Sequence, residues 1–262
     1  DGINLLWSRY NNIINNAISN NGDGIYLSYY SSNNTIYHNN FNNTIQAWAE
    51  STQSWNYHGE GNYWKDYTGR DLNNDGIGDT KPYIIVNGNE DKYPLMGAFS
   101  DYDVTLERKT YHAAIVSNST ISDFGFQTGT ETGNRIISFR AATGNGKMGF
   151  GRVTFPRELM EDPYIVLIGA VKVTPTLLNV SDQSSVCLYF TYSDGAAVIS
   201  IIASETLHLY AELLAKYLEL QGSLQTLNQT YYGLLTNYLK LQADLFNLSK
   251  ALNDSSVHYL EL

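Results

Sequence analysis

The stretch NNIINNAISNN, from Asn11 to Asn21, recurs as NNTIYHNNFNN from Asn33 to Asn43, an offset of 22 residues. The tetrapeptide GINL at residues 2–5 recurs as GIYL at residues 24–27, at the same offset. Apolar and polar residues alternate within each copy, which predicts short strands, and the asparagine pairs suit the turns between them. A repeat of this length made of several short strands is typical of a parallel β-helix with one coil per repeat.

We therefore expect the Ile, Leu and Phe residues of the repeat to stack inside and the asparagines to form ladders at the corners. Low-complexity Asn-rich sequence is the alternative, but the apolar residues keep their phase in both copies. Two coils are fewer than the three or so that a solenoid needs, so the first coil is expected to present an open edge. Further coils before Asp1 of a parent protein, or another subunit, would cover that edge.

The hydrophobic period changes twice along the chain and divides it into three expected domains. Residues 1–97 are the terminal coils of the β-helix. Residues 98–204 are the second domain, and from about Tyr111 to Ser204 they hold seven or eight short alternating segments separated by turn residues, which predicts an antiparallel β-sandwich. Residues 205–262 are expected to form a coiled-coil helix. The expected fold class is mainly β, with a parallel β-helix end segment, an antiparallel β-sandwich and a long C-terminal α-helical coiled coil.

The C-terminal segment carries an unbroken 3,4 spacing of apolar residues. With Tyr210 at heptad position a, leucine occupies six successive d positions, more than the three or four heptads that indicate a coiled coil. No proline follows Pro175, and a helix over residues 205–262 would be about 85 Å long. The residues expected to mediate oligomerisation are Tyr210, Leu213, Tyr217, Leu220, Leu224, Leu227, Tyr231, Leu234, Tyr238, Leu241, Leu245, Leu248 and Leu252.

An amphipathic helix folded onto its own sandwich is the alternative, but a 3.5-residue period drifts out of phase on a straight helix of this length. We therefore expect a homo-oligomer. Tyrosines at a, with Leu209 at g and Leu214 and Leu235 at e, widen the seam, so a trimer or larger bundle is favoured over a dimer. Few charges lie at e and g, so ion pairs do not encode the choice of partner tightly.

An acidic loop near the end of the first domain has the spacing of a calcium-binding loop. Asp71, Asn73, Asp75 and Asp79 stand at positions 1, 3, 5 and 9, Gly76 permits the sharp turn, and Ile77 offers its carbonyl. Pro82 occupies the position of the usual bidentate glutamate, so Asp66 or Asp91 would have to supply it. The sequence predicts a structural calcium ion here, with a sodium- or water-filled acidic turn as the alternative.

Composition excludes several classes of function. The 262 residues have a net charge of −10 and a pI near 4.8, which argues against a nucleic-acid or anionic-membrane footprint. One cysteine excludes an intrachain disulfide and a cysteine-rich metal site. No apolar run of about 20 residues is present, so no membrane span is expected within this chain. No catalytic constellation is visible, and we do not expect an enzyme.

The motifs NNTIYHNNFNNTIQAW (33–48), GNYWKDYTGRDLNNDGIGDTKPYII (61–85) and DKYPLM (91–96) resemble the terminal part of archaeal cell-surface β-helix proteins related to the NosD-like family. The stretch from TGNRIISFRAATG (132–144) to Ser204 is similar to a β-sandwich module that follows such helices. The resemblance implies an exported, modular, surface-displayed protein without an established activity. The copper label of NosD-like proteins is not supported here, because no His, Met and Cys cluster has ligand spacing.

An exported protein would be accessible to glycosylation, and N-X-Ser/Thr sequons are present. They occur at Asn33, Asn42, Asn118, Asn179, Asn228, Asn247 and Asn253. Asn247 and Asn253 fall at the outer positions c and b, whereas a glycan on Asn228 at e would limit how many helices can pack. The expected location is extracellular, at the cell surface.

The favoured function is that of a structural protein of the archaeal cell surface, in contact with neighbouring subunits of a surface layer or an extracellular filament. A viral or adhesive fibre has the same features. A carbohydrate-binding β-helix is the other alternative, with Tyr26, Tyr29, Tyr30, Trp48 and Trp55 available to stack on sugars. Glycan cleavage is disfavoured, because it needs two converging carboxylates and the sequence pairs none.

Overall fold

Short strands at the start of the chain pair in parallel with the strands one repeat later. β1 pairs with β4 and places Ile3 opposite Ile25; β2 pairs with β5, and β3 with β6. Strands β7 and β8 extend two of these sheets. A small antiparallel pair, β9 and β10, follows. The bounds are β1 Ile3–Leu6, β2 Asn12–Ile14, β3 Ala17–Ser19, β4 Asp23–Ser28, β5 Thr35–Tyr37, β6 Asn40–Asn42, β7 Ile45–Ala49, β8 Tyr63–Trp64, β9 Tyr83–Ile84 and β10 Glu90–Asp91.

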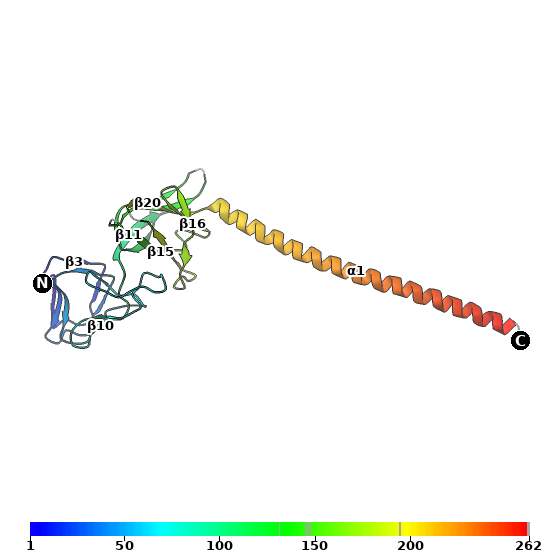
Figure 1. The fold of residues 1–262 in the computed structure, drawn as a ribbon, viewed down its shortest axis with the longest axis horizontal. Coiled ribbons are helices and arrows are strands. Elements are labelled where there is room, and N and C mark those ends of the chain that lie inside the picture. The colour runs from blue at the N-terminus through cyan, green and yellow to red at the C-terminus, as the bar shows by residue number, and fades with distance from the viewer. Residues whose placement is uncertain (131, 145, 147, 194, 261–262) are drawn as a thin grey trace. The chain divides into compact units, whose positions relative to one another are not determined.

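The computed structural model describes residues 1–260 except 131, 145, 147 and 194, and it leaves the side chains of 205–212 and 254–260 undescribed. The protein is mainly β, with parallel and antiparallel sheets and one long C-terminal helix (Figure 1). The chain forms two compact units, Asp1–Glu205 and Thr206–Leu262. This confirms the mainly β class and the C-terminal helix at that level.

Asparagine ladders connect successive repeats, as the sequence predicts. The side chain of Asn16 donates to Asn39 Oδ1 at 2.9 Å, and that of Asn39 donates to Asn62 Oδ1 at 3.0 Å. Asp91 takes the next place, since its Oδ2 accepts from the backbone N–H of Asn62 at 2.7 Å. Each amide satisfies backbone and side-chain groups that burial would otherwise leave without partners. Inside these ladders lies an apolar core that includes Ile25, Leu27, Ile36, Phe41 and Trp64.

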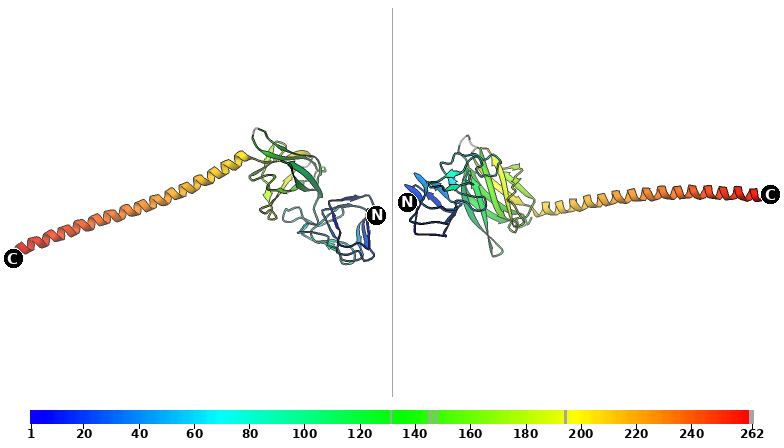
Figure 2. Two further views of the ribbon diagram at one scale, coloured as in Figure 1. Left: turned by 180° about the vertical axis from the view of Figure 1, so that it is seen from behind. Right: turned by 90° about the horizontal axis from the view of Figure 1, so that it is seen from below.

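Two five-stranded antiparallel sheets follow from residue 98, with strand orders β11-β12-β15-β19-β18 and β13-β14-β20-β16-β17. Alternate residues of both sheets, such as Ile115 and Phe155 in one and Ile137 and Ile199 in the other, share one buried core. Figure 2 shows these strands side by side in its right-hand view. The bounds are β11 Ala98–Leu106, β12 Lys109–Ser117, β13 Thr120–Thr128, β14 Arg135–Ala142, β15 Gly149–Pro156, β16 Tyr164–Ile168, β17 Val171–Val173, β18 Thr176–Leu177, β19 Ser185–Tyr192 and β20 Ala196–Ala203.

The repeat region and the two-sheet region pack against each other within the first unit. Ile77 and Leu95 from the end of the repeat region join Phe99, Val116 and Phe150 of the two-sheet region in a small buried cluster. The ring of Phe99 also stacks on His38, with centroids 4.0 Å apart. The junction is therefore a packed interface and not a free linker.

The helix α1 spans Glu205–Leu260 without interruption, and both views of Figure 2 show it unbroken. The absence of proline after Pro175 allows this continuity, because an interior proline removes a hydrogen bond and kinks a helix. Serine and threonine hydroxyls back-bond to the preceding turn, as Thr226 Oγ1 does to the Gly222 carbonyl at 3.0 Å. Among the residues described, no helix has the length and the apolar character that a membrane crossing requires.

Candidate functional site

The apolar seam on α1 is a candidate interaction surface. Its described members project from one uninterrupted helix with 55–69% of each side chain's surface exposed within this chain. The helix places them together because residues three and four apart share a face. Tyr210, which the sequence assigns to the same seam, lies outside the residues whose side chains are described. A contiguous apolar surface of this size is typical of a protein–protein contact.

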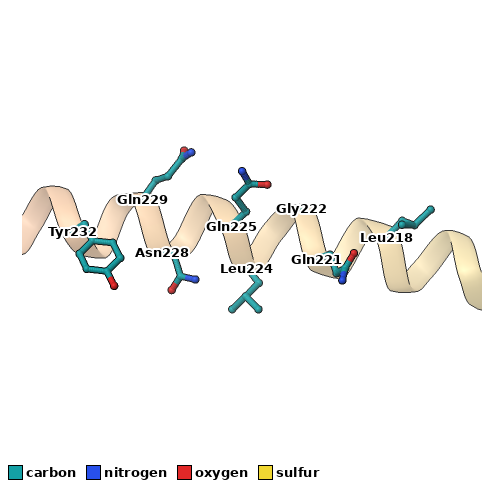
Figure 3. Close-up of a pocket in the computed structure, with 8 residues that line it drawn as sticks. All are labelled: Leu218, Gln221, Gly222, Leu224, Gln225, Asn228, Gln229 and Tyr232. Atoms are coloured by element: carbon teal, nitrogen blue, oxygen red, sulfur yellow. The ribbon is translucent and has the colours of Figure 1, made fainter.

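Polar side chains interrupt the apolar surface at defined points. Leu224 and Asn228 project from the lower side of the helix in Figure 3, and Gln225 and Gln229 from the upper side. Together with Gly222, these four side chains border a shallow, open hollow on the helix surface.

The acidic loop brings the predicted side chains together, but their carboxylates accept hydrogen bonds from the backbone N–H groups of the loop itself. Asp71 accepts hydrogen bonds from the N–H groups of Asn74, Asp75 and Gly76, and Asp79 accepts from that of Leu72. Further contacts link the remaining predicted residues. Asn73 Nδ2 donates to Asp75 Oδ2 at 3.1 Å, and the Ile77 N–H donates to Asp75 Oδ1 at 2.8 Å.

The suppliers suggested for the twelfth position are engaged elsewhere. Asp66 accepts from the Tyr83 hydroxyl at 3.3 Å. Asp91 is fully buried and accepts from the Asn62 N–H, the Trp64 indole N–H and the Tyr93 N–H. Neither carboxylate completes the acidic loop.

A buried ion pair connects the repeat region to the two-sheet region. Arg152 on β15 is 2% exposed, and its Nη2 lies 2.7 Å from Glu60 Oε1, a charge contact without good hydrogen-bond alignment. Glu60 Oε2 lies 2.7 Å from His38 Nε2. Burial raises the pKa of Glu60, but His38 and Arg152 outweigh burial and lower that pKa to about 2. Glu60 therefore stays ionised in the folded protein.

Trp7, Tyr29 and Tyr30 form an exposed group, which we call the aromatic corner. The Trp7 ring lies 6.0 Å from the Tyr29 ring and 5.1 Å from the Tyr30 ring, between centroids. The three side chains are 57–68% exposed, and the backbone φ angles are 56°, 47° and 63°. Bulky residues with positive φ are strained outliers, and such strain clusters at functional positions.

Sequence reasoning found the aromatic corner only in part. It named Tyr29 and Tyr30 but missed Trp7, although the 22-residue offset of the repeat places position 7 beside position 29. Trp48 stacks on Tyr26 with centroids 4.5 Å apart. Trp55 was expected to be available for sugars, but it is 1% exposed and donates its indole N–H to Asn89. Its ring is part of the core.

All seven sequon asparagines are exposed within the unit that carries them. The Asn118 side chain is also structural, because its Nδ2 donates to the Met148 carbonyl and its Oδ1 accepts from the Phe150 N–H. Glycosylation at the seven positions stays a prediction.

The buried thiol of Cys187 has no features of a reactive or ligating group. Burial raises its pKa, which Arg152 only partly opposes, and Thr154 donates its hydroxyl to the sulfur at 3.2 Å. In the part of the chain that the structure describes, no three His, Cys, Asp or Glu side chains are grouped to hold a metal ion.

These features define a repeat-built β protein that carries a long amphipathic helix. The family model described as "Periplasmic copper-binding protein (NosD)" matches residues 1–69. The chain is 43% identical over 75 residues to a protein of Stutzerimonas stutzeri named "Probable ABC transporter binding protein NosD", and 37% identical over 75 residues to the protein of the same name in Pseudomonas aeruginosa. Each match covers 28% of this chain and 17% or 18% of the relative. No solved structure matches the chain.

The comparison supports the NosD-like resemblance for the first part of the chain, and the chain spans less than a fifth of the relatives it matches. The prediction of calcium as the cofactor is wrong, because the matching family is described as copper-binding. There is a physical reason within the loop. Its carboxylates already accept backbone hydrogen bonds, and burial raises the pKa of Asp75, which disfavours the ionised form that a calcium ion needs.

The described residues do not fit copper either. Copper prefers imidazole, thiolate and thioether ligands. His38 is bonded to Glu60, next to the Arg152 cation, and the buried Cys187 sulfur accepts a hydrogen bond from Thr154. The residues that the structure describes therefore offer no ligand set for copper.

The buried Asp91 gives the first unit a distinctive pH dependence. Burial raises the pKa of Asp91 to about 6, although the Asn62, Trp64 and Tyr93 donors oppose this. A raised pKa in the folded state means that the folded protein binds the proton more tightly than the unfolded chain does. The free energy of unfolding therefore rises as the pH falls through 6 towards the pKa that Asp91 has in the unfolded chain. We expect Asp91→Asn to remove about 2 kcal/mol of this gain between pH 7 and pH 4.5.

Denaturant unfolding followed by tryptophan fluorescence at several pH values measures this difference. The lowered pKa of Glu60 acts in the opposite direction, because its stabilisation is present above about pH 4.5 and is lost as the pH falls towards 2. A variant Glu60→Gln serves as the control and should keep the gain between pH 7 and pH 4.5. Equal slopes for the wild type and Asp91→Asn in that window would contradict the assignment.

Proposed function

We propose that this protein is a structural component of the cell surface that self-associates through α1. In this proposal residues 1–97 are terminal coils of a parallel β-helix, residues 98–204 are a β-sandwich module, and α1 is one strand of a coiled coil. The role is structural and not catalytic. Neighbouring subunits of a surface layer or an extracellular filament, in an archaeal or similar envelope, are the partners.

The seam on α1 is the observation that carries the proposal. Its period of 3.5 residues persists through six heptads, and the helix is continuous over all of them. A seam of a dozen large side chains offers roughly 1,200 Å² of apolar surface, above the roughly 800 Å² per partner of a standard interface. Because burial of apolar surface drives association, copies of α1 are expected to pair along this seam.

Two features support a location outside the cytoplasm. The family that matches residues 1–69 is described as periplasmic, and the seven exposed sequons suit an exported glycoprotein. The parallel pairing of strands 22 or 23 residues apart supports the β-helix, since each repeat then forms one coil. The open edge of β1, β2 and β3 is available to a neighbouring coil or subunit.

The mass of the full chain in solution tests the proposal. Light scattering coupled to size exclusion should give a multiple of the 29.4 kDa chain at micromolar concentration. A particle of one chain at high micromolar concentration, with α1 still helical, would contradict the proposal.

The aromatic corner favours glycan binding as a second candidate function. Its exposed rings are arranged like a platform on which the apolar face of a sugar ring can stack. Left-handed backbone at non-glycine residues costs about 1 kcal/mol or more at each position. Packing does not compensate for this cost at Trp7, because 68% of its side chain is exposed.

We expect Trp7→Asn to abolish retention on glycan arrays while the thermal midpoint stays equal or rises. Asparagine tolerates the left-handed conformation, so the substitution relieves strain as it removes the platform. Leu72, which is also 68% exposed, provides the matched control, and Leu72→Asn should leave retention unchanged. A fall in stability with Trp7→Asn would instead make Trp7 a packing residue, and unchanged retention would exclude the site.

A further inference from the structure

The charged residues of α1 are confined to one side of the helix. With Tyr210 at a, every charged residue in the described range 213–253 falls at c, f or g. They are Lys216, Glu219, Lys240, Asp244 and Lys250. By sequence position alone, Glu205, Glu212 and Asp254 also fall at c. A two-stranded coiled coil leaves b as exposed as c, so the absence of charge from b and e calls for a second buried face.

Positions b and e instead carry a second apolar seam. Within this chain its large side chains are 39–71% exposed. They are Leu214, Leu218, Tyr232, Leu235, Leu239 and Phe246. They offer roughly 600 Å² of apolar surface in addition to the a/d seam, which alone suffices for a dimer. Pairing along a/d would leave this second seam in water.

The angle between the two seams sets the number of helices that can meet. Position b follows a by one residue and e follows d by one residue, so the b/e seam is the a/d seam rotated by about 103° at 3.5 residues per turn. A helix in a closed ring contacts its two neighbours in directions that differ by the interior angle of the polygon. That angle is 60° for three helices, 90° for four and 108° for five, so three helices cannot use both seams.

The residues between the two seams suit the inside of such a ring. Positions a and e lie between d and b, and e carries the polar side chains of Gln221, Asn228 and Gln242. Gln221 Nε2 donates to Tyr217 Oη at 2.9 Å, and Gln242 Nε2 donates to Tyr238 Oη at 2.7 Å. These pairs satisfy polar groups that would face a central channel.

We propose that the partner of α1 is a ring of identical copies, four or five parallel helices in all, in which the a/d seam of each copy packs on the b/e seam of the next. Such a contact is heterologous, and it closes because the rotation between neighbours matches the angle between the seams. This inference rests on the proposed function, since it specifies the assembly that self-association produces.

Sedimentation equilibrium of the full chain tests the ring, and the wild type should have four or five times the mass of one 29.4 kDa chain. The double variant Leu239→Lys with Phe246→Lys places charge on the b/e seam alone and should reduce the assembly to two or three chains. The matched control is Thr236→Lys with Ala243→Lys, both at the outer position f, and it should keep the wild-type mass. Circular dichroism verifies that each variant remains helical.

The outcomes separate the ring from self-association itself. A wild-type dimer or trimer would overturn the ring while self-association through α1 stands. A wild-type tetramer or pentamer that the b/e variant leaves intact would also overturn it, because the second seam would then be unused. A wild-type monomer would overturn both proposals.

Asn228 gives a second readout that does not depend on mass. It lies at e inside the ring, where a glycan has no room, whereas Asn247 lies at c on the outside. Peptide mass spectrometry of the native protein should find Asn228 unmodified. A glycan on Asn228 of the assembled protein would overturn the ring.

Discussion

Leu234→Asp should weaken self-association of the chain by at least 100-fold. Leu234 lies at d near the middle of the seam and is 64% exposed in the isolated chain, so association is expected to bury it. Removing a buried leucine and burying a carboxylate costs about 3 kcal/mol or more in each copy, and 1.4 kcal/mol corresponds to a factor of ten. A dilution series in the analytical ultracentrifuge should show one chain where the wild type is assembled.

Thr236→Asp is the matched control, because position 236 lies two residues away on the outer face of the same helix. It introduces the same charge with a similar helix propensity, so the assembly should persist. If both variants kept the wild-type mass, the d positions would not be the interface. If both dissociated, added charge and not the seam would explain the effect.

Arg152→Met should destabilise the first unit by about 3–5 kcal/mol. The substitution removes a buried cation and leaves the largely buried Glu60 with His38 but without its arginine partner, and breaking a buried pair in this way is costly. For a unit of this size the thermal midpoint should fall by about 10 °C. The four tryptophans all lie in the repeat region, so their fluorescence reports this unfolding separately from that of α1.

Arg140→Met is the control, because Arg140 pairs with Asp123 at the surface and its side chain is 51% exposed. Surface pairs contribute about 0.2–1 kcal/mol, so little change is expected. The double variant Glu60→Gln with Arg152→Met should recover much of the loss, since no buried charge then lacks a partner. A loss of under 1 kcal/mol for Arg152→Met would show that the junction depends on apolar packing instead.

The sequence predicted the features that depend on local periodicity. The period of two residues and the offset of 22 residues led to the parallel strand pairs and to the asparagine ladders that connect Asn16, Asn39 and Asn62. The 3,4 spacing led to the helix, and alternation led to the antiparallel sheets and to the burial of Cys187. The β-helix and the coiled coil as such remain predictions.

Among the predicted sites, the calcium site was the prediction that was wrong. The spacing of Asp71, Asn73, Asp75 and Asp79 brought these side chains together, but spacing does not reveal that backbone N–H groups of the loop already donate to the carboxylates or that burial raises the pKa of Asp75. The prediction that Trp55 is available to sugars was wrong for a similar reason, because its position in a polar stretch does not show that its ring faces the core.

The sequence by itself determined the secondary structure, the repeat and the long apolar seam, because each is a periodic pattern that recurs along the chain at a fixed spacing. Only the tertiary structure decided that Arg152 meets Glu60 from 92 residues away and that Phe99 stacks on His38. Such contacts arise from packing between separate elements, and no local pattern encodes the distance between two side chains that the fold brings together.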